Sequence, residues 1–208
     1  MIHDLSYTVG PDTMAYPGTE KPVLKVMNTV EKDGFQETLL SMFSHAGTHM
    51  DAPAHMIKGA AYLDTLPVSR FCGRAYVMDC TAYGAGEEIP ASALPGLNGL
   101  DFLVLSSGWE KHWGTDEYFG RFPVLSPEAA DIVAAAGLSG VGVDMMSVDP
   151  MDTVDFPVHM RFFNKGMVII ENLRGLEQLR GKTVEICALP LKYENADGAP
   201  VRVVAFEG

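Results

Sequence analysis

The sequence has few cysteines, and this scarcity excludes a small, disulfide-rich secreted scaffold. There are three, Cys72, Cys80 and Cys187. Their number is odd, and none forms the C-x-x-C spacing of zinc ribbons and thiol redox motifs. The N-terminus also lacks the basic leader and apolar run of a signal peptide. We therefore predict reduced thiols in a cytoplasmic protein.

Long apolar runs and positive charge are also lacking. No stretch approaches the ~20 apolar residues that span a membrane. Lys and Arg number 15 against 27 Asp and Glu, which gives a formal net charge of −12. A surface of this sign repels phosphate backbones, and no basic cluster suggests attachment to a membrane. We expect a small-molecule substrate, with neither nucleic acid nor a membrane as a partner.

Several catalytic signatures are absent as well, namely the Walker loop, the G-x-G-x-x-G turn and the G-x-S-x-G elbow. What remains has the composition of an ordinary globular chain, with 47% hydrophobic and 20% charged residues. Its 208 residues suit one domain over 1–208 with a substantial core.

Turn signals divide the chain into many short strands and few helices. Asp33-Gly34 predicts a hairpin between the first two strands. The clearest helix is 127–136, with Ser126 as its N-cap and Gly137 just past its end, and a shorter one is predicted at 175–180. Strands are predicted at 22–31, 35–43, 73–80, 101–106, 140–145, 166–171, 183–189 and 201–206.

The order of these elements predicts an α/β fold. Strand 101–106, helix 127–136 and strand 140–145 indicate a crossover between parallel strands. The apolar strand 101–106 is expected to be buried on both faces. The N-terminal hairpin is antiparallel, which implies a mixed sheet or two sheets.

Three of the six histidines lie within eleven residues, in the pattern H-x-G-T-H-x-D-x-P-x-H. His45, His49, Asp51 and His55 all fall on one parity of this segment. Imidazole and carboxylate are the usual ligands of catalytic Zn²⁺ and of related ions. The segment therefore predicts a metal site.

The segment from His45 to His55 has to bend if its side chains are to bind the same ion. Gly47 and Pro53 argue against a continuous helix, and full extension from His45 to His55 would spread the side chains over ~30 Å. Gly47 provides backbone freedom and Pro53 fixes a turn, so we expect a bend at each.

Other candidate residues lie far along the chain, after predicted strands. Glu171 ends the apolar run 167–170, where a carboxylate is costly unless it is paired, metal-bound or able to reach solvent. Asp144 and Asp149 follow strand 140–145. His159 is a polar residue among apolar neighbours and, taken alone, is more often a hydrogen-bonded core histidine.

On these residues the sequence resembles the cyclase family of metal-dependent hydrolases, which includes bacterial kynurenine formamidase and isatin hydrolase. The segment His45–His55 matches the family motif at every fixed position. Shorter matches extend over nearly the whole chain, and Tyr16 stands where the family often has Trp. These shorter matches are 4–6, 16–18, 107–109, 142–149, 158–159, 170–173 and 188–191.

The resemblance implies a swivelling β/β/α fold and a homodimer or higher oligomer. It also implies that His45, His49 and Asp51 bind a metal, and that His159 and Glu171 complete that site or a second one. By the same resemblance, His55 would be the catalytic acid/base residue. The cofactor is then one or two divalent ions, with Zn²⁺ favoured and Mn²⁺ as the alternative.

The expected function is metal-dependent hydrolysis of an amide-type bond, in an aryl formamide or a cyclic amide, by a metal-activated water. One alternative is a metal-dependent cyclase or dehydratase, which would use the same site. Another is a non-catalytic metal-binding protein, in which protein ligands would enclose the ion completely.

Overall fold

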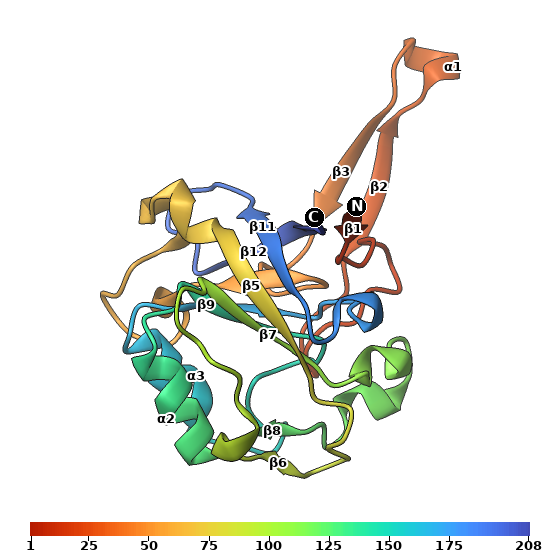
Figure 1. The fold of residues 1–208 in the computed structure, drawn as a ribbon. Helices are drawn as coiled ribbons and strands as arrows, with labels where there is room; N and C mark the ends of the chain where they lie inside the picture. Colours follow the sequence, from red (N-terminus) through yellow and green to blue (C-terminus); the bar gives the residue numbers. More distant parts are fainter.

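The computed structural model describes all 208 residues and is built around one mixed sheet that closes on itself (Figure 1). Strands β5, β7, β9 and β10 run parallel, and the remaining pairs are antiparallel. A pairing between β12 and β4 closes the sheet, and β1 extends it from β12. In sheet order the strands are β1 (Ile2–Asp4), β12 (Gly198–Phe206), β11 (Thr183–Pro190), β5 (Cys72–Asp79), β7 (Phe102–Ser106), β9 (Gly140–Val143), β10 (Val168–Glu171) and β4 (His49–Asp51).

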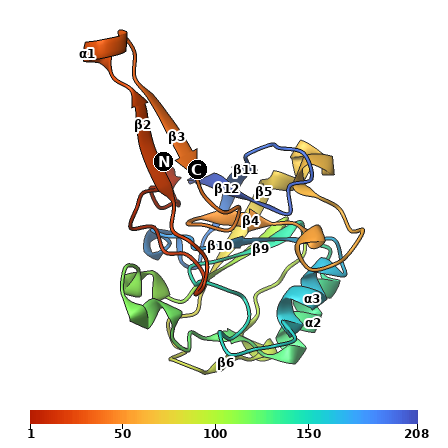
Figure 2. The same ribbon diagram turned by 180° about the vertical axis from the view of Figure 1, so that it is seen from behind.

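Two hydrophobic cores lie on the two faces of this closed sheet. On β7, Phe102 and Val104 point into the core enclosed by the strands, whereas Leu103 and Leu105 point outward. The outward side chains pack against helices α2 (Pro127–Ala135) and α3 (Pro157–Phe163), which lie side by side over that face (Figure 2). The prediction that this strand is buried on both faces is confirmed.

The predicted elements are largely present. All of the expected strands form, although several are shorter than expected. The helix after Ser126 begins as expected, because the Ser126 side chain accepts a hydrogen bond from the Ala129 N–H. Gly137 follows its end with a positive φ of 77°. The region 175–180 contains only one 3₁₀ turn, Glu177–Leu179.

Two features differ from the sequence expectation. Helix α3 was not predicted, because Pro157 at its start and only seven residues give little periodic signal. The N-terminal hairpin of β2 (Val23–Asn28) and β3 (Glu37–Ser41) does form, but its tip is a short helix, α1 (Val30–Asp33), rather than a tight turn. A small parallel pair, β6 (Glu88–Ile89) and β8 (Val124–Leu125), forms a separate two-stranded sheet.

The prediction of three reduced thiols is wrong for two of them. Cys72 on β5 and Cys187 on β11 face each other across antiparallel strands and form a disulfide, while Cys80 is free and buried. These two residues are 115 positions apart in sequence, and only the sheet brings them together. The cysteines therefore no longer support a cytoplasmic location, since disulfides are uncommon in the cytosol.

None of the helices combines the length and the apolar character needed to cross a membrane.

Candidate metal centre

Strands β4 and β10 place three of the candidate side chains on the outer face of the closed sheet. His49 and Asp51 are two residues apart on β4 and so share a face, while Met50 between them points into the inner core. Glu171 pairs with His49 across the two strands. The outer face of this strand pair therefore carries two buried carboxylates and one buried imidazole.

The segment bends at both positions that the sequence predicts. Gly47 has a φ of 67°, a backbone conformation that favours glycine, and it turns the chain between His45 and β4. Pro53 begins a 3₁₀ turn that ends at His55. Because of these two bends, the strand is limited to His49–Asp51, and the flanking histidines fold back over it.

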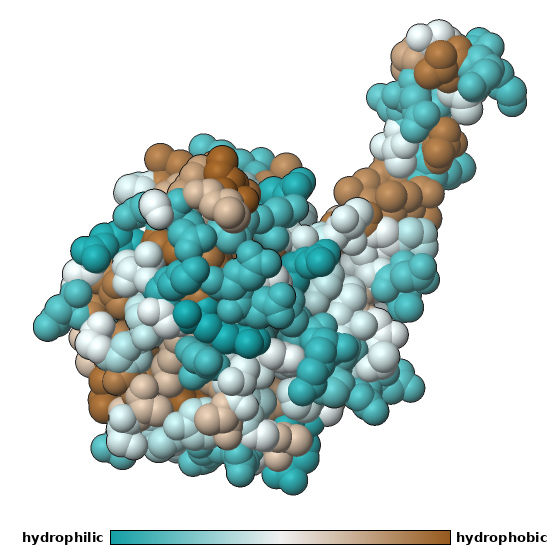
Figure 3. Space-filling view, turned by 45° about the vertical axis from the view of Figure 1, so that its right-hand side comes forward, coloured by the Kyte–Doolittle hydropathy of each residue, from teal (hydrophilic) through white to brown (hydrophobic).

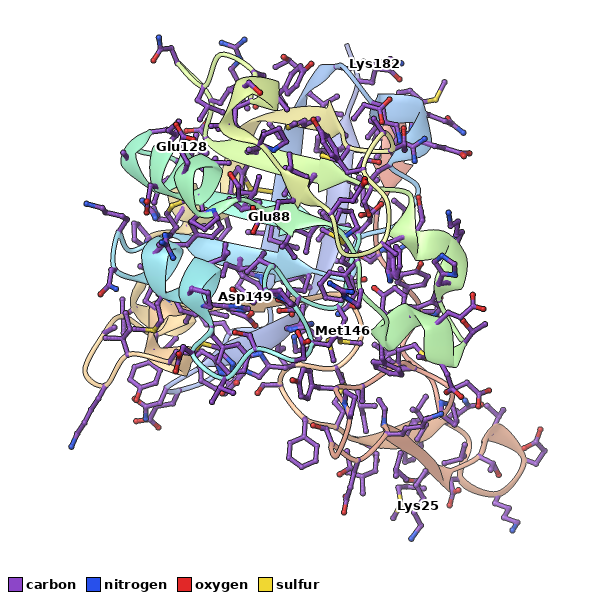
Figure 4. The ribbon with its side chains drawn as sticks, turned by 90° about the horizontal axis from the view of Figure 1, so that it is seen from below. Lys25, Glu88, Glu128, Met146, Asp149 and Lys182 are labelled. Atoms are coloured by element: carbon purple, nitrogen blue, oxygen red, sulfur yellow. A yellow bond between two sulfur atoms is a disulfide. The ribbon has the colours of Figure 1, made fainter.

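His159 reaches the same place from helix α3. Its Nε2 lies 3.4 Å from Glu171 Oε1 and 3.9 Å from Asp51 Oδ2. The loop between β9 and α3 carries Met146 and Asp149, both labelled in Figure 4. Asp149 accepts hydrogen bonds from the His159 backbone N–H and bonds to His159 Nδ1 at 2.7 Å.

Two of the three groups of potential ligand atoms in the structure are adjacent and share Asp51. His45, His49 and Asp51 make the first set, and Asp51, His159 and Glu171 make the second. Within each set the ligand atoms lie within 4.8 Å of one another. The structure thus brings together all five residues that the sequence and the resemblance nominate as metal ligands.

The chemistry of these groups fits a bound cation. Asp51 and Glu171 are almost completely buried, and no lysine or arginine lines the cavity beside them. Glu171 Oε1 is buried without a hydrogen-bond partner. Buried carboxylates are stable only when they are paired, protonated or bound to a metal. The three nearby imidazoles and the unpaired Glu171 Oε1 together match the ligand set of a divalent ion.

The same carboxylates shift the pKa values of the histidines. Burial acts to lower the pKa of His49, but Asp51 and Glu171 outweigh it and hold that pKa well above its usual value. Burial likewise opposes protonation of His159, yet Asp149 and Glu171 raise its pKa to about 10. Without a metal, these rings are therefore protonated at neutral pH and compensate the buried negative charge.

A cavity of about 250 Å³ opens beside this cluster. All five cluster residues and His55 line it together with apolar and aromatic side chains. His55 has a side chain that is 30% exposed. Phe156, at the start of α3, has a φ of 45°, which is rare for a bulky residue. Strain of this kind occurs preferentially at functional sites. The remaining apolar and aromatic lining residues are Tyr16, Phe43, Met56 and Met146.

Sequence reasoning missed two residues beside the cluster. Asp197 accepts from His45 Nε2 at 3.1 Å, and in the sequence the Asp197-Gly198 pair indicates only a turn. Asn172, with a φ of 59°, donates to the Gly47 carbonyl and so fixes the bend before His49. Asp144 is buried at the end of β9, but it binds Ser107 and Gly108 rather than the cluster.

The closed mixed sheet and the cluster of imidazoles and carboxylates define a metal-dependent hydrolase. Residues 3–150 match the family model Cyclase, described as "Putative cyclase". Because this match covers more than half of the chain, the chain belongs to the Cyclase family.

The relatives agree with this assignment over nearly their whole length. The chain is 32% identical to a kynurenine formamidase of Salinibacter ruber over 207 residues, covering 97% of this chain and 95% of the relative. It is 31% identical to a kynurenine formamidase of Bacillus cereus over 204 residues, with the same coverage. Both relatives are hydrolases, in accord with the hydrolase class expected from the sequence.

Solved structures confirm the fold. Isatin hydrolase A from Labrenzia aggregata has a TM-score of 0.88 and 24% identity, covering 99% of this chain and 93% of that one. A structure described as a potential metal-dependent hydrolase with cyclase activity has a TM-score of 0.81 and 26% identity, covering 99% and 96%. The expected α/β class with a mixed sheet is confirmed.

The raised pKa values of His49 and His159 predict that metal binding releases protons. At pH 7.5 both rings carry a proton in the metal-free protein, and a ligand imidazole has to lose it. Titration of Zn²⁺ into metal-free protein should therefore release about one proton or more per ion. Isothermal calorimetry in buffers of different ionisation enthalpy measures this number. Affinity should rise with pH, and a heat that is independent of the buffer contradicts the prediction.

Proposed function

We propose that residues 1–208 form a single hydrolase domain that cleaves an amide-type bond of a small molecule, an aryl formamide or a cyclic amide. The observation that carries this proposal is the convergence of three imidazoles and two buried carboxylates at the wall of an open cavity. The similarity to kynurenine formamidases supports the choice of bond. A fully enclosed structural ion would have no such opening.

In this proposal, five residues hold the metal. When bound, a divalent ion lowers the pKa of a water towards ~7 and polarises a carbonyl oxygen. The anionic ligands Asp51 and Glu171 supply two negative charges, which favours a divalent ion over a monovalent one. Mixed nitrogen and oxygen ligation suits Zn²⁺ and Mn²⁺ alike, and we propose Zn²⁺ first. The five proposed ligands are His45, His49, Asp51, His159 and Glu171.

His55 is the proposed acid/base residue. Burial lowers the pKa of its ring, so the ring is neutral at pH 7 and able to accept a proton. Its ring lies against that of His45, with centroids 4.0 Å apart, and it borders the cavity beside the cluster. From there His55 can take a proton from water and return it to the leaving nitrogen.

The cavity wall favours an aromatic substrate. Tyr16, Phe43 and Phe156 provide aromatic surface, and Met56 and Met146 provide adaptable apolar surface. A flat ring can therefore pack against the wall while its carbonyl group faces the cluster. A cyclase or dehydratase remains the alternative within the same site, because it needs the same ligands and differs only in the substrate that the wall admits.

The first experiment tests metal dependence and bond type together. Protein purified without a histidine tag and stripped of metal should be inactive, and one or two equivalents of Zn²⁺ or Mn²⁺ should restore hydrolysis. N-formylkynurenine, isatin and cyclic imides form the substrate panel, and release of the aryl amine or opening of the ring is followed by absorbance. Full activity in the stripped protein, or no hydrolysis of any member, contradicts the proposal.

Substitution of His55 separates its role from that of a ligand. His55→Ala should keep the metal content of the unsubstituted protein and lower kcat about 10²-fold or more, because proton transfer is lost. Elemental analysis and steady-state kinetics measure the two effects. The matched control is His112→Ala, since His112 contacts Glu117 on the surface and lies outside the cluster. Loss of metal from His55→Ala would instead make His55 a ligand.

We also propose that the protein is a homodimer or higher oligomer, held by the β2–β3 hairpin. This arm projects from the body, and hydrophobic side chains gather along it (Figure 3). An isolated two-stranded hairpin is marginal in water, and apolar side chains on both strands favour a second copy as the covering surface. The exposed apolar residues of the arm are Val23, Leu24, Val26, Met27, Val30, Phe35, Leu39 and Leu40.

A cytoplasmic location stays a prediction.

Charge placed on the arm should dissociate this oligomer. Leu24 and Leu40 are paired across β2 and β3, so the double substitution Leu24→Lys and Leu40→Lys introduces two adjacent cations. Light scattering after size-exclusion chromatography should show a monomer for this variant and a dimer or larger species for the unsubstituted chain. Val154→Lys is the control, because Val154 is equally apolar and 85% exposed but lies far from the arm in sequence. A monomeric unsubstituted chain contradicts the proposal.

A further inference from the structure

The three imidazoles of the cluster are each held at the nitrogen that faces away from it. His49 directs Nε2 towards Asp51 and Glu171, and its Nδ1 bonds to the Gly47 carbonyl at 2.8 Å. His159 directs Nε2 towards the same carboxylates, and its Nδ1 bonds to Asp149. Such outer partners fix the tautomer and orientation of metal-binding histidines.

His45 follows the same pattern with its nitrogens reversed. Its Nδ1 lies 2.6 Å from Asp51 Oδ1, on the cluster side, and its Nε2 lies 3.1 Å from Asp197 Oδ2, on the other side. Asp197 is not among the residues that line the cavity. It therefore contacts the cluster through His45.

We propose that Asp197 is a positioning residue that holds His45 with its Nδ1 lone pair directed at the metal. This inference rests on the proposed metal site. A neutral imidazole has one lone pair and one N–H. Acceptance of the Nε2–H by the Asp197 carboxylate leaves the lone pair on Nδ1, where Asp51, the ligand shared by both donor sets, is located.

The backbone around Asp197 is shaped for this contact. The Asp197 carbonyl accepts from the Ala52 N–H at 2.9 Å, and Gly198 pairs with Asp51 across β12 and β4. A Cβ on Gly198 would lie 2.3 Å from His45 Cε1, so only glycine lets the ring lie against the strand. The His45 ring is thus fixed between two carboxylates and a bare stretch of backbone.

The carboxylate of Asp197 is itself held in place. Tyr193 donates its hydroxyl to Asp197 Oδ1 at 3.1 Å and also to the Gly198 carbonyl. This leaves Oδ2 to face His45 at 3.1 Å, with His55 Nδ1 farther away at 3.9 Å. The side chain of Asp197 is 43% exposed, so its replacement removes the contact to His45 without opening a hole in a core.

His45, His55 and Asp197 also lie close enough to hold an ion by themselves. That arrangement requires the Nε2 lone pair of His45. The same ring would then need to lose its proton to bind a second ion through Nδ1, which a neutral imidazole does not do. If Asp197 positions His45, the His45 ring stays available to the metal site that contains Asp51. If Asp197 is itself a metal ligand, His45 is drawn away from that site.

The test compares Asp197→Ala and Asp197→Asn for metal affinity. Loss of an outer partner weakens metal binding by about 10–100-fold, and we expect this for Asp197→Ala with an unchanged number of ions. Asp197→Asn keeps an acceptor oxygen and should lie between Ala and the unsubstituted chain. Competition with a chromophoric chelator gives the Kd. ¹⁵N correlation spectra of His45 in the Zn²⁺-bound protein should show a protonated Nε2, less populated in Asp197→Ala.

The matched control is Asp64→Asn. Asp64 accepts from the Ala196 N–H, so this change removes a carboxylate that holds the same loop without touching His45, and its Kd should stay unchanged. A Kd for Asp197→Ala within twofold of the unsubstituted chain overturns the inference. Loss of one ion per chain also overturns it, because Asp197 would then be a ligand. Failure of the unsubstituted chain to bind metal overturns the proposed function instead.

Discussion

The site depends on two carboxylates that are buried without a permanent cation beside them. Asp51 and Glu171 sit on paired strands, and no lysine or arginine lines the cavity that they border. Burial of such charges costs several kcal/mol each unless an opposite charge compensates them. In the metal-free protein the imidazoles provide that charge by taking up protons, and a divalent ion can replace those protons. In the proposed metal site, the histidines would serve as counter-ions in the metal-free state and as ligands in the metal-bound state, which would couple metal content to pH.

The closed sheet turns this requirement into a defined geometry. β4 is only three residues long, yet it joins β10 to β12 and so completes the barrel. Its middle residue, Met50, belongs to the inner core, and this fixes the register that directs His49 and Asp51 outward. A shift by one residue would bury both polar side chains in the barrel. The packing of Met50 therefore helps to decide where the proposed metal ligands lie.

The sequence predicts the parts of this site that are local in the chain. The spacing from His45 to His55, with Gly47 and Pro53 between, is enough to predict a bent segment and a metal. The strand ending in Glu171 follows from its apolar run. Patterns among neighbouring residues do not predict contacts between residues that are far apart in the chain and that only the closed sheet brings together. Asp197 is 152 positions from His45, and in sequence its Asp-Gly pair signals only a turn. Helix α3 is too short to show a period, so His159 was reached through the family resemblance. The disulfide partners Cys72 and Cys187 were missed for the same reason as Asp197.

The residues of the site, taken together with His55 and Asp197, differ in exposure, and this difference suits them to different tasks. Asp51, His159 and Glu171 are all buried, and Asp149, which anchors His159, is completely buried. His45 and His55 have side chains that are 22% and 30% exposed, and Asp197 behind them is more exposed still. A buried, fully anchored part keeps its geometry while water and substrate exchange. In the proposed mechanism, a proton that leaves the reaction crosses the more exposed part of the site, where His55 is the proposed acid/base residue.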